Sequence, residues 1–254
     1  MNLNGKNIVI TGGAGGIGRT VVKTLLDLGA VVCVIDRDKI GLSLLKKSLS
    51  KLQKQNTFFF NIDVGQFDQV KYAVNQFFDK RKSIHGLLNN AAVLLDRPLI
   101  GFSEGKLNKY SLKNWKETLA SNLDSCFFVT REVVEKMAKN FTHGVIVNVS
   151  SISAAGNKGQ TAYAASKGAI NALTVTWAQE LSPLGIRVAG LAPGIVDTDM
   201  PKKSLSKNLL KTIINKTPTK RMATPKEISH GIIFIIENDF FCGRTLELDG
   251  GLRM

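Results

Sequence analysis

Short apolar runs alternate with stretches of helical periodicity along the whole chain, and no other feature of the sequence constrains the fold as much. Runs that are apolar almost throughout are typical of parallel strands buried on both faces. The intervening stretches, such as 15–28 and 163–181, carry apolar residues at helical spacing. The pattern predicts an α/β fold in which a doubly wound parallel sheet of about seven strands has helices on both faces. The predicted strands cover residues 7–10, 31–35, 57–62, 86–89, 144–149, 187–191 and 245–248.

The alternation shows no sign of a second domain. Because the 254 residues contain no internal repeat, low-complexity tract or linker, we expect a single domain over residues 1–254. Two segments, 93–111 and 197–222, interrupt the rhythm and are expected to be long loops. Both follow the carboxyl ends of predicted strands, where doubly wound sheets bind ligands, so we expect them to border a functional site.

The charge balance is strongly basic. The chain has 34 Lys and Arg against 20 Asp and Glu, which gives a formal net charge of +14. Such a field attracts anionic ligands, including nucleotides, coenzyme A and acidic carrier proteins. A lysine-rich solubilising surface would give the same count. No basic segment is interleaved with aromatic residues, so the sequence does not support specific nucleic-acid binding.

Cysteine usage and hydropathy bear on the environment of the protein. Cys33, Cys126 and Cys242 are widely spaced and form no CxxC pair, so we expect neither a disulfide framework nor a metal site, and a reducing compartment. No stretch reaches the roughly 18 apolar residues of a membrane span. The N-terminus lacks a signal-peptide pattern. We therefore expect a cytoplasmic protein without membrane contact; a transit peptide removed beforehand would leave no trace in the sequence.

A glycine-rich turn follows the first predicted strand and opens the first predicted helix, over the sequence TGGAGGIG at residues 11–18. Glycines allow the backbone to turn sharply and to approach a pyrophosphate, and the helix N-terminus offers free N–H groups. An ordinary strand–helix turn would also use glycines. The position of the cluster nevertheless favours a Rossmann-type nucleotide site, with Gly12, Gly16, Ile17 and Gly18 at the phosphates.

Asp36 ends the second predicted strand, 18 residues after Gly18. A carboxylate at this place accepts hydrogen bonds from an adenosine ribose and repels a 2′-phosphate, which predicts NAD rather than NADP. Arg37 leaves the choice open, because a guanidinium can hold a 2′-phosphate. It is otherwise a solvated residue at a helix start. Asp63, at the end of the third run, is expected to meet the adenine ring or to cap the next helix.

Tyr163 and Lys167 are four residues apart on a predicted helix, so they share one face. A free phenol has a pKa near 10, and a neighbouring ammonium favours the phenolate. The tyrosine could then take a proton from an alcohol or give one to a ketone. The strand at 144–149 ends in Ser150 and Ser151, and a serine hydroxyl there could steady an oxyanion.

Taken together, these motifs resemble the short-chain dehydrogenase/reductase family over almost the full length of the chain. The matching elements are TGGAGGIG (11–18), DV (63–64), NNAA (89–92), SNL around Asn122, NVSS (148–151), YAASK (163–167) and APGIVDT (192–198). The resemblance implies a catalytic tetrad of Asn122, Ser151, Tyr163 and Lys167, in which the asparagine helps to hold a water that connects the lysine to solvent. It also implies a single dinucleotide-binding catalytic domain.

The resemblance extends the expected NAD site beyond the glycine turn. The further residues expected to contact the cofactor are Val64, Asn90, Ala91, Tyr163, Lys167, Pro193, Gly194, Val196 and Thr198. The chain departs from the family pattern in having Ala92 where a glycine is usual, and Ala189 or Gly190 where an asparagine is often found. Ser151 lies 12 residues before Tyr163. A spacing one residue longer is commoner in the family and would select Ser150; we favour Ser151 because of its offset from Asn148.

A narrower similarity concerns the C-terminus, from residue 235 to Met254, and the insert between Ala92 and Trp115. Both are similar to type-2 3-hydroxyacyl-CoA dehydrogenases, which use NAD. This implies an oxidoreductase that interconverts a secondary alcohol and a ketone, here 3-hydroxyacyl-CoA and 3-oxoacyl-CoA. Residues 202–211 would then meet the coenzyme A phosphates through Lys202, Lys203, Lys207 and Lys211, or else form a solvated face.

Other functions stay open at this point. Residues 156–160, before the tyrosine, resemble 3-oxoacyl-carrier-protein reductases, which are biosynthetic and usually NADPH-linked, and Asp36 argues against them. A steroid or a polyol could also be the substrate. A non-catalytic scaffold leaves the tetrad without a use. The resemblance further implies a homotetramer, and the apolar faces of the predicted helices 112–139 and 163–181 would either form its interfaces or cover the sheet.

Overall fold

A seven-stranded parallel sheet forms the centre of the computed structural model, which describes residues 1–103 and 105–253 without the side chains of Ser103, Lys203 and Ser204. The strand order is β3-β2-β1-β4-β7-β8-β9, and all neighbouring pairs are parallel. The predicted doubly wound α/β fold is therefore confirmed. The strands are β1 (Asn7–Thr11), β2 (Val31–Asp36), β3 (Thr57–Asn61), β4 (Gly86–Asn89), β7 (Gly144–Val149), β8 (Ile186–Pro193) and β9 (Thr245–Leu248).

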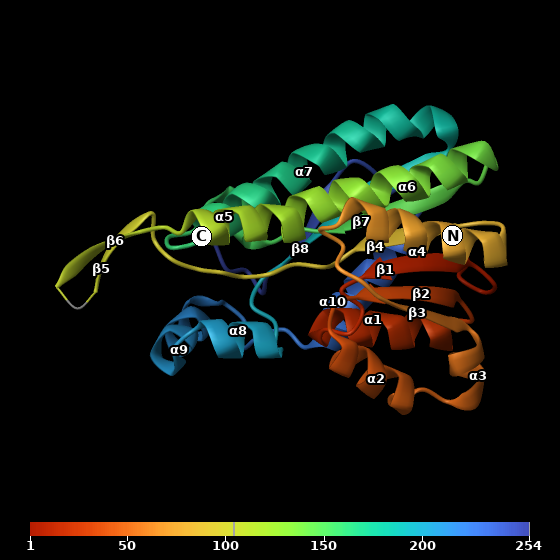
Figure 1. Cartoon of the computed structure of the whole chain (residues 1–254). Helices are drawn as coiled ribbons and strands as arrows, with labels where there is room; N and C mark the ends of the chain where they lie inside the picture. Colours follow the sequence, from red (N-terminus) through yellow and green to blue (C-terminus); the bar gives the residue numbers. More distant parts are fainter. Residues whose placement is uncertain (104, 254) are drawn as a thin grey trace.

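Helices cover both faces of this sheet (Figure 1). The helices of the main body are α1 (Gly16–Asp27), α2 (Lys39–Ser48), α4 (Phe67–Arg81), α5 (Leu112–Leu119), α6 (Ser125–Lys139), α7 (Thr161–Leu181) and α10 (Pro225–Glu237), together with the short α3 (Lys51–Gln55). Helices α1 and α10 lie side by side on one face, and α4, α6 and α7 lie on the other.

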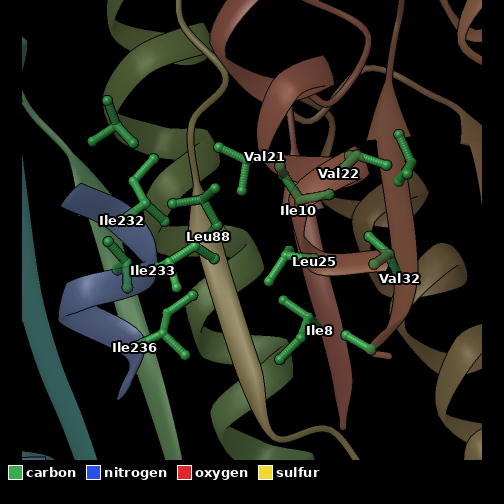
Figure 2. Close-up of a cluster of buried hydrophobic side chains, with 14 of the residues drawn as sticks. Ile8, Ile10, Val21, Val22, Leu25, Val32, Leu88, Ile232, Ile233 and Ile236 are labelled. Atoms are coloured by element: carbon green, nitrogen blue, oxygen red, sulfur yellow. The ribbon is translucent and has the colours of Figure 1, made fainter. Parts of the chain in front are cut away.

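Each face has its own hydrophobic core, because the strands point alternate side chains to opposite sides. On the first face, Ile8 and Ile10 of β1 meet Leu25 of α1 and Ile232 of α10 (Figure 2). On the second face, Phe77 of α4 packs with side chains of α6 and β7. Burial on both faces explains why the strands read as continuous apolar runs rather than as alternating ones.

Some helix starts are capped by side chains, whereas the start of α1 is not. Thr224 caps α10 through a reciprocal pair of hydrogen bonds with Glu227, and Pro225 occupies the first helical position. In α1 the N-cap residue is Gly15, no side chain accepts from the first N–H groups, and the first turn has no acidic residue. The N-terminal turn of α1 thus keeps its donors available for a ligand.

The two segments expected to be loops contain regular structure, so that expectation was wrong in part. Residues 93–111 include an antiparallel hairpin of β5 (Ile100–Ser103) and β6 (Lys106–Lys109), which projects from the body of the protein (Figure 1). Residues 197–222 include the helices α8 (Asp199–Ser204) and α9 (Lys207–Lys216). The hairpin strands are exposed, so they carry no buried-strand pattern.

One expected helix is also divided. The predicted helix 112–139 is resolved into α5, a π-helix over Ala120–Asp124 and α6. A π-turn widens the helix by one residue and often marks a functional site. The family-implied Asn122 lies within this turn.

Candidate active site

A cleft of about 610 Å³ opens at the carboxyl edge of the sheet. It lies beside the ends of β1 and β4, at the point where the strand order reverses direction, which is where doubly wound sheets bind ligands. Its walls include the glycine-rich turn, Asp36 and, at the other end, Tyr163 and Lys167. The cleft therefore joins the predicted nucleotide site to the predicted reactive pair.

The glycine-rich turn packs too closely for larger side chains. A Cβ on residue 12 would lie 2.8 Å from the Ala91 Cα, and the φ angle of Gly12 is 66°. A Cβ on residue 18 would lie 2.1 Å from the carbonyl oxygen of Gly12. The glycines are thus needed to bring β1, α1 and the end of β4 together.

The carboxylate of Asp36 is held at the end of β2 by two backbone donors. The N–H of Ala14 donates to Oδ2 at 2.9 Å, and the N–H of Asp38 donates to Oδ1 at 2.9 Å. The carboxylate is therefore fixed against the glycine-rich turn. Asp63 accepts from the N–H of Gly65 at 2.9 Å, a local turn bond, and it borders the cleft. It does not cap α4, whose N-cap residue is Gln66 and has no side-chain cap bond, so the expected capping role was wrong.

Tyr163 lies in the first turn of α7, where it is partly buried beside Ser151. Burial raises the pKa of Tyr163 to about 12, and a hydrogen bond with Ser151 acts in the opposite direction. The Oγ of Ser150 instead donates to the Lys167 carbonyl oxygen at 3.2 Å. The structure thus places Ser151, rather than Ser150, against the tyrosine.

Lys167 is buried one turn further along α7. Its Nζ donates to the Val149 carbonyl oxygen at 2.7 Å and lies 5.8 Å from the centroid of the Tyr163 ring. Burial lowers the pKa of Lys167 to about 8. The expectation that an ammonium would lower the tyrosine pKa is not met in this arrangement, because the loss of solvent outweighs other effects on both groups.

Asn122 holds the segment after β4 in place. Its Oδ1 accepts from the Val93 N–H at 2.8 Å, and its Nδ2 donates to the Val93 carbonyl oxygen at 3.0 Å and to Ser166 Oγ at 3.3 Å. The side chain is thus occupied by protein partners.

A polar chain from the 93–111 segment reaches the same region, and the sequence analysis missed it. Asp96 Oδ2 accepts from Gln160 Nε2 at 2.7 Å, and Asn157 Nδ2 donates to Gln160 Oε1 at 2.9 Å. The other carboxylate oxygen of Asp96 is buried without a partner. Burial raises the pKa of Asp96, and its charge raises that of Tyr163.

A second missed feature is a buried polar network beneath the site. Asn89 Nδ2 donates to Asn148 Oδ1 at 2.9 Å and to Thr130 Oγ1 at 2.9 Å. Asn148 Nδ2 donates to Thr174 Oγ1 at 3.0 Å. The network ties β4 and β7 to α6 and α7 and so fixes the helix that carries the reactive pair. In the sequence, the asparagines of the NNAA and NVSS motifs are the feature that could have indicated this network.

Most of the predicted cofactor residues border the cleft, and four predicted site residues do not. Asn122 and Ser151 lie behind its wall, Gly194 packs against the backbone of Asp249, and Val196 is buried. The lining residues outside the predicted site are Ala14, Gly15, Arg19, Ile35, Arg37, Asp38, Ala92, Val93, Ser121, Val149, Ser150, Asp197, Asp199 and Met200. Of these, Arg37 and Ser150 were alternatives that the sequence left open. Several of these lining residues are next to predicted residues in the sequence, and this adjacency could have identified them.

The residues of the cleft fit a dinucleotide. The uncapped start of α1 offers backbone donors to phosphates, and the fixed Asp36 offers acceptors to a ribose. Within the described residues, no group of three or more His, Cys, Asp or Glu side chains is arranged to hold a metal. Nor is any helix there long and apolar enough to cross a membrane. The cysteines Cys33, Cys126 and Cys242 are free.

Comparison with known proteins gives consistent matches. The family model for short chain dehydrogenases matches residues 6–209. The chain is 36% identical to the 3-oxoacyl-[acyl-carrier-protein] reductase of Thermotoga maritima, covering 99% of both chains. It is 34% identical to the enzyme of that name from Chlamydia pneumoniae, covering 99% of this chain and 98% of the relative.

A solved structure agrees on the fold. Levodione reductase superposes with a TM-score of 0.88 at 24% identity, covering 98% of this chain and 97% of the other. At that identity the likeness concerns the fold alone. With the family match and the relatives, it leads to one conclusion: the chain belongs to the short-chain dehydrogenase/reductase family and is an NAD(P)-dependent oxidoreductase acting on CH–OH groups.

Proposed function

We propose that this protein reduces 3-oxoacyl thioesters to 3-hydroxyacyl thioesters, with the acyl group carried on an acyl carrier protein and NADH as the reductant. The substrate proposal is supported by the relatives, which are named 3-oxoacyl-[acyl-carrier-protein] reductases over the full length of the chain. They favour this reading over the 3-hydroxyacyl-CoA reading of the sequence. The observation that carries the chemistry is the position of Tyr163 and Lys167 at one end of the cleft, with Ser151 hydrogen-bonded to Tyr163 behind the cleft wall.

The residues of the site divide the work as follows. The bound nicotinamide supplies hydride for reduction, or accepts it in the reverse direction. Tyr163 donates its phenolic proton to the carbonyl oxygen, and Ser151 hydrogen-bonds the same hydroxyl and the developing oxyanion. The Nζ of Lys167 is held by the Val149 carbonyl oxygen and lies beside the Tyr163 ring, so Lys167 helps to position the tyrosine. Asn122 fixes the backbone at Val93 beside the substrate end.

The proposed preference for NAD(H) is supported by Asp36. Its carboxylate is fixed at the end of β2, and a 2′-phosphate close to it would meet an uncompensated negative charge. The proposed cofactor site comprises the residues predicted from the sequence that border the cleft, from Gly12 to Thr198. Location in the cytoplasm, a single domain and a homotetramer stay predictions.

A second candidate substrate is the corresponding coenzyme A thioester. Carrier protein and coenzyme A present the acyl group on the same phosphopantetheine arm. The position of the reactive residues is therefore compatible with either substrate. Lys207 and Lys211 of α9 are exposed and suit a phosphate, and α9 follows α8, whose Asp199 and Met200 border the cleft. Lys202 does not, because its Nζ lies 2.6 Å from Asp197, and the side chain of Lys203 lies outside the described residues.

The test is a spectrophotometric assay of the purified protein with NADH and NADPH. The substrates are acetoacetyl carrier protein, acetoacetyl-CoA, a steroid ketone and a polyol-derived ketone. We expect kcat/KM to be highest for the carrier substrate with NADH. Higher activity with the steroid or polyol ketone would overturn the substrate proposal, and a preference for NADPH would overturn the cofactor proposal.

The Tyr163→Phe variant tests the assignment of the proton donor. Removal of the hydroxyl should lower kcat by at least about 100-fold, because proton transfer is lost. Binding of NADH, followed by nicotinamide fluorescence, should stay near wild type. Activity close to wild type would show that another group supplies the proton.

A further inference from the structure

Arg37 lies between two acidic side chains that come from different elements. Its Nη1 is 4.0 Å from Asp63 Oδ2, after β3, and its Nη2 is 3.9 Å from Glu117 Oε1, on α5. About half of the Arg37 side chain is exposed. The guanidinium thus bridges the end of β2 and the helix α5, away from its neighbour Asp36, whose carboxylate is bound to the glycine-rich turn.

Arg37 also stands on the boundary between the cofactor cleft and a second depression. It borders both, and Lys116 and Glu117 of α5 line only the second. The cations that border the cofactor cleft within the described residues are Arg19, Arg37 and Lys167. Arg19 donates to the Ala14 carbonyl oxygen, and Lys167 belongs to the reactive end. Of these three cations, Arg37 is therefore the one that could turn to bind a phosphate at the ribose end.

We propose that Glu117 is a positioning residue for cofactor choice: with Asp63, it holds Arg37 toward α5 and so withholds the guanidinium from a 2′-phosphate. This inference rests on the proposed binding of NAD(H). Asp36 disfavours the phosphate by repulsion, and Glu117 removes the cation that would compensate for it. Two carboxylates within 4.0 Å already offset the charge of Arg37, so a 2′-phosphate would compete with them for the guanidinium.

The substitution Glu117→Gln tests the proposal. Because each exposed ion pair contributes little binding energy, release of Arg37 should lower the Kd for NADPH by about three- to fivefold. The Kd for NADH should stay within about twofold of the wild-type value. Binding is measured by nicotinamide fluorescence on the purified protein. The adenosine ends alone, 2′,5′-ADP and 5′-AMP, are measured by calorimetry. The gain should appear for 2′,5′-ADP and not for 5′-AMP, and it should shrink as salt is added.

Two controls separate a contact from a general change in charge. Glu180→Gln removes an exposed carboxylate of the same type from α7 and should leave both constants unchanged. In the double variant Arg37→Gln/Glu117→Gln, the gain for 2′,5′-ADP should disappear. The proposal is overturned if Glu117→Gln does not tighten NADPH, or if the gain persists without Arg37. A wild-type protein that binds NADPH better than NADH would instead refute the NAD(H) proposal itself, whatever Glu117 does.

Discussion

At the scale of single residues, burial governs the pair that performs the proposed proton transfer. It raises the pKa of Tyr163 to about 12 and lowers that of Lys167 to about 8, so burial shifts both groups toward their neutral forms, although Lys167 stays protonated below about pH 8. Carbonyl reduction needs the phenol, and alcohol oxidation needs the phenolate. Reduction should therefore proceed at neutral pH, whereas oxidation should gain as the pH rises toward the tyrosine pKa.

Asp96 should influence this balance, because its charge raises the pKa of Tyr163. Asp96→Asn keeps an acceptor for Gln160 and removes the charge, so the pKa of Tyr163 should fall. The pH profile of kcat/KM for alcohol oxidation should then move to lower pH. Asp79→Asn, an exposed charge on α4, serves as the control and should leave the profile in place. An unshifted profile in Asp96→Asn would mean that Asp96 is neutral when the enzyme works.

Lys167 should make stability depend on pH. Its folded pKa of about 8 lies below the ordinary 10.5, so the unfolded state binds more protons between these values, and stability rises with pH across that window. Below about pH 8 the buried charge costs about 3 kcal/mol. Lys167→Met lacks this dependence. The raised pKa of Tyr163 acts at higher pH and is common to both proteins.

The measurement is urea denaturation of wild type and Lys167→Met at pH 7 and pH 10. The variant also leaves the Val149 carbonyl without its donor, which lowers its stability equally at both values. The expected result is therefore a difference: relative to wild type, the variant is more favoured at pH 7 than at pH 10. Equal differences at the two values would show that Lys167 keeps an ordinary pKa in the folded protein.

At the scale of elements, the turn from β1 to α1 is fixed by backbone contact. In Gly18→Ala the new Cβ would meet the Gly12 carbonyl oxygen, and backbone cannot move aside as a side chain can. We expect a loss of about 3 kcal/mol in the free energy of unfolding, despite the higher helix propensity of alanine. The loss is measured by denaturation without cofactor.

Gly15→Ala is the matched control for this turn. Gly15 has φ −75° and ψ 176°, and a Cβ there would meet nothing nearer than the Gly12 carbonyl oxygen at 3.6 Å. Gly15→Ala should lower the free energy of unfolding by about 0.5 kcal/mol, the difference between glycine and alanine at an N-cap. Equal losses in the two variants would contradict the role of close packing at Gly18.

The strands that sequence reasoning located best are those buried on two faces. β4 and β7 begin and end with their apolar runs, because burial imposes that pattern. β9 also matches its predicted run, although this edge strand is only partly buried. The hairpin β5–β6 is exposed and carries no such signal. α9 does carry a helical signal, with Leu209 and Leu210 four residues before Ile213 and Ile214 and a capping Ser206, and the sequence analysis overlooked it. In the site, local motifs indicated Tyr163 and Lys167. The contact of Asp96 with Gln160 joins distant segments, and no spacing rule predicts it.

At the scale of the whole molecule, the net charge and the exposed apolar side chains are the features that govern contact with other molecules. The exposed apolar side chains include Leu112 of α5, Phe127 of α6 and Val175 of α7. These are the helices whose faces a homotetramer would cover, and the assembly stays a prediction. The net charge of +14 would attract an acidic carrier or a coenzyme A phosphate from any direction, so a local contact must be separated from the general field.

Lys207→Glu/Lys211→Glu makes that separation. Both side chains are exposed on α9, and the two reversals change the net charge from +14 to +10. If α9 receives the phosphates, KM for acetoacetyl carrier protein should rise about fivefold to tenfold, with kcat and NADH binding unchanged, because the contact is equally strong in ground and transition states. The effect should fade with added salt, which screens exposed charges.

The control variant Lys51→Glu/Lys54→Glu makes the same change in net charge on α3, far from α9 in the fold (Figure 1). The control substrate is the acetoacetyl thioester of N-acetylcysteamine, which has the reacting group without a phosphate. Only the α9 variant, and only with a phosphate-bearing substrate, should show the raised KM. If both variants weaken the carrier substrate equally, the general field attracts it. If neither does, α9 is a solvated face, and the phosphopantetheine arm enters from another side of the cleft.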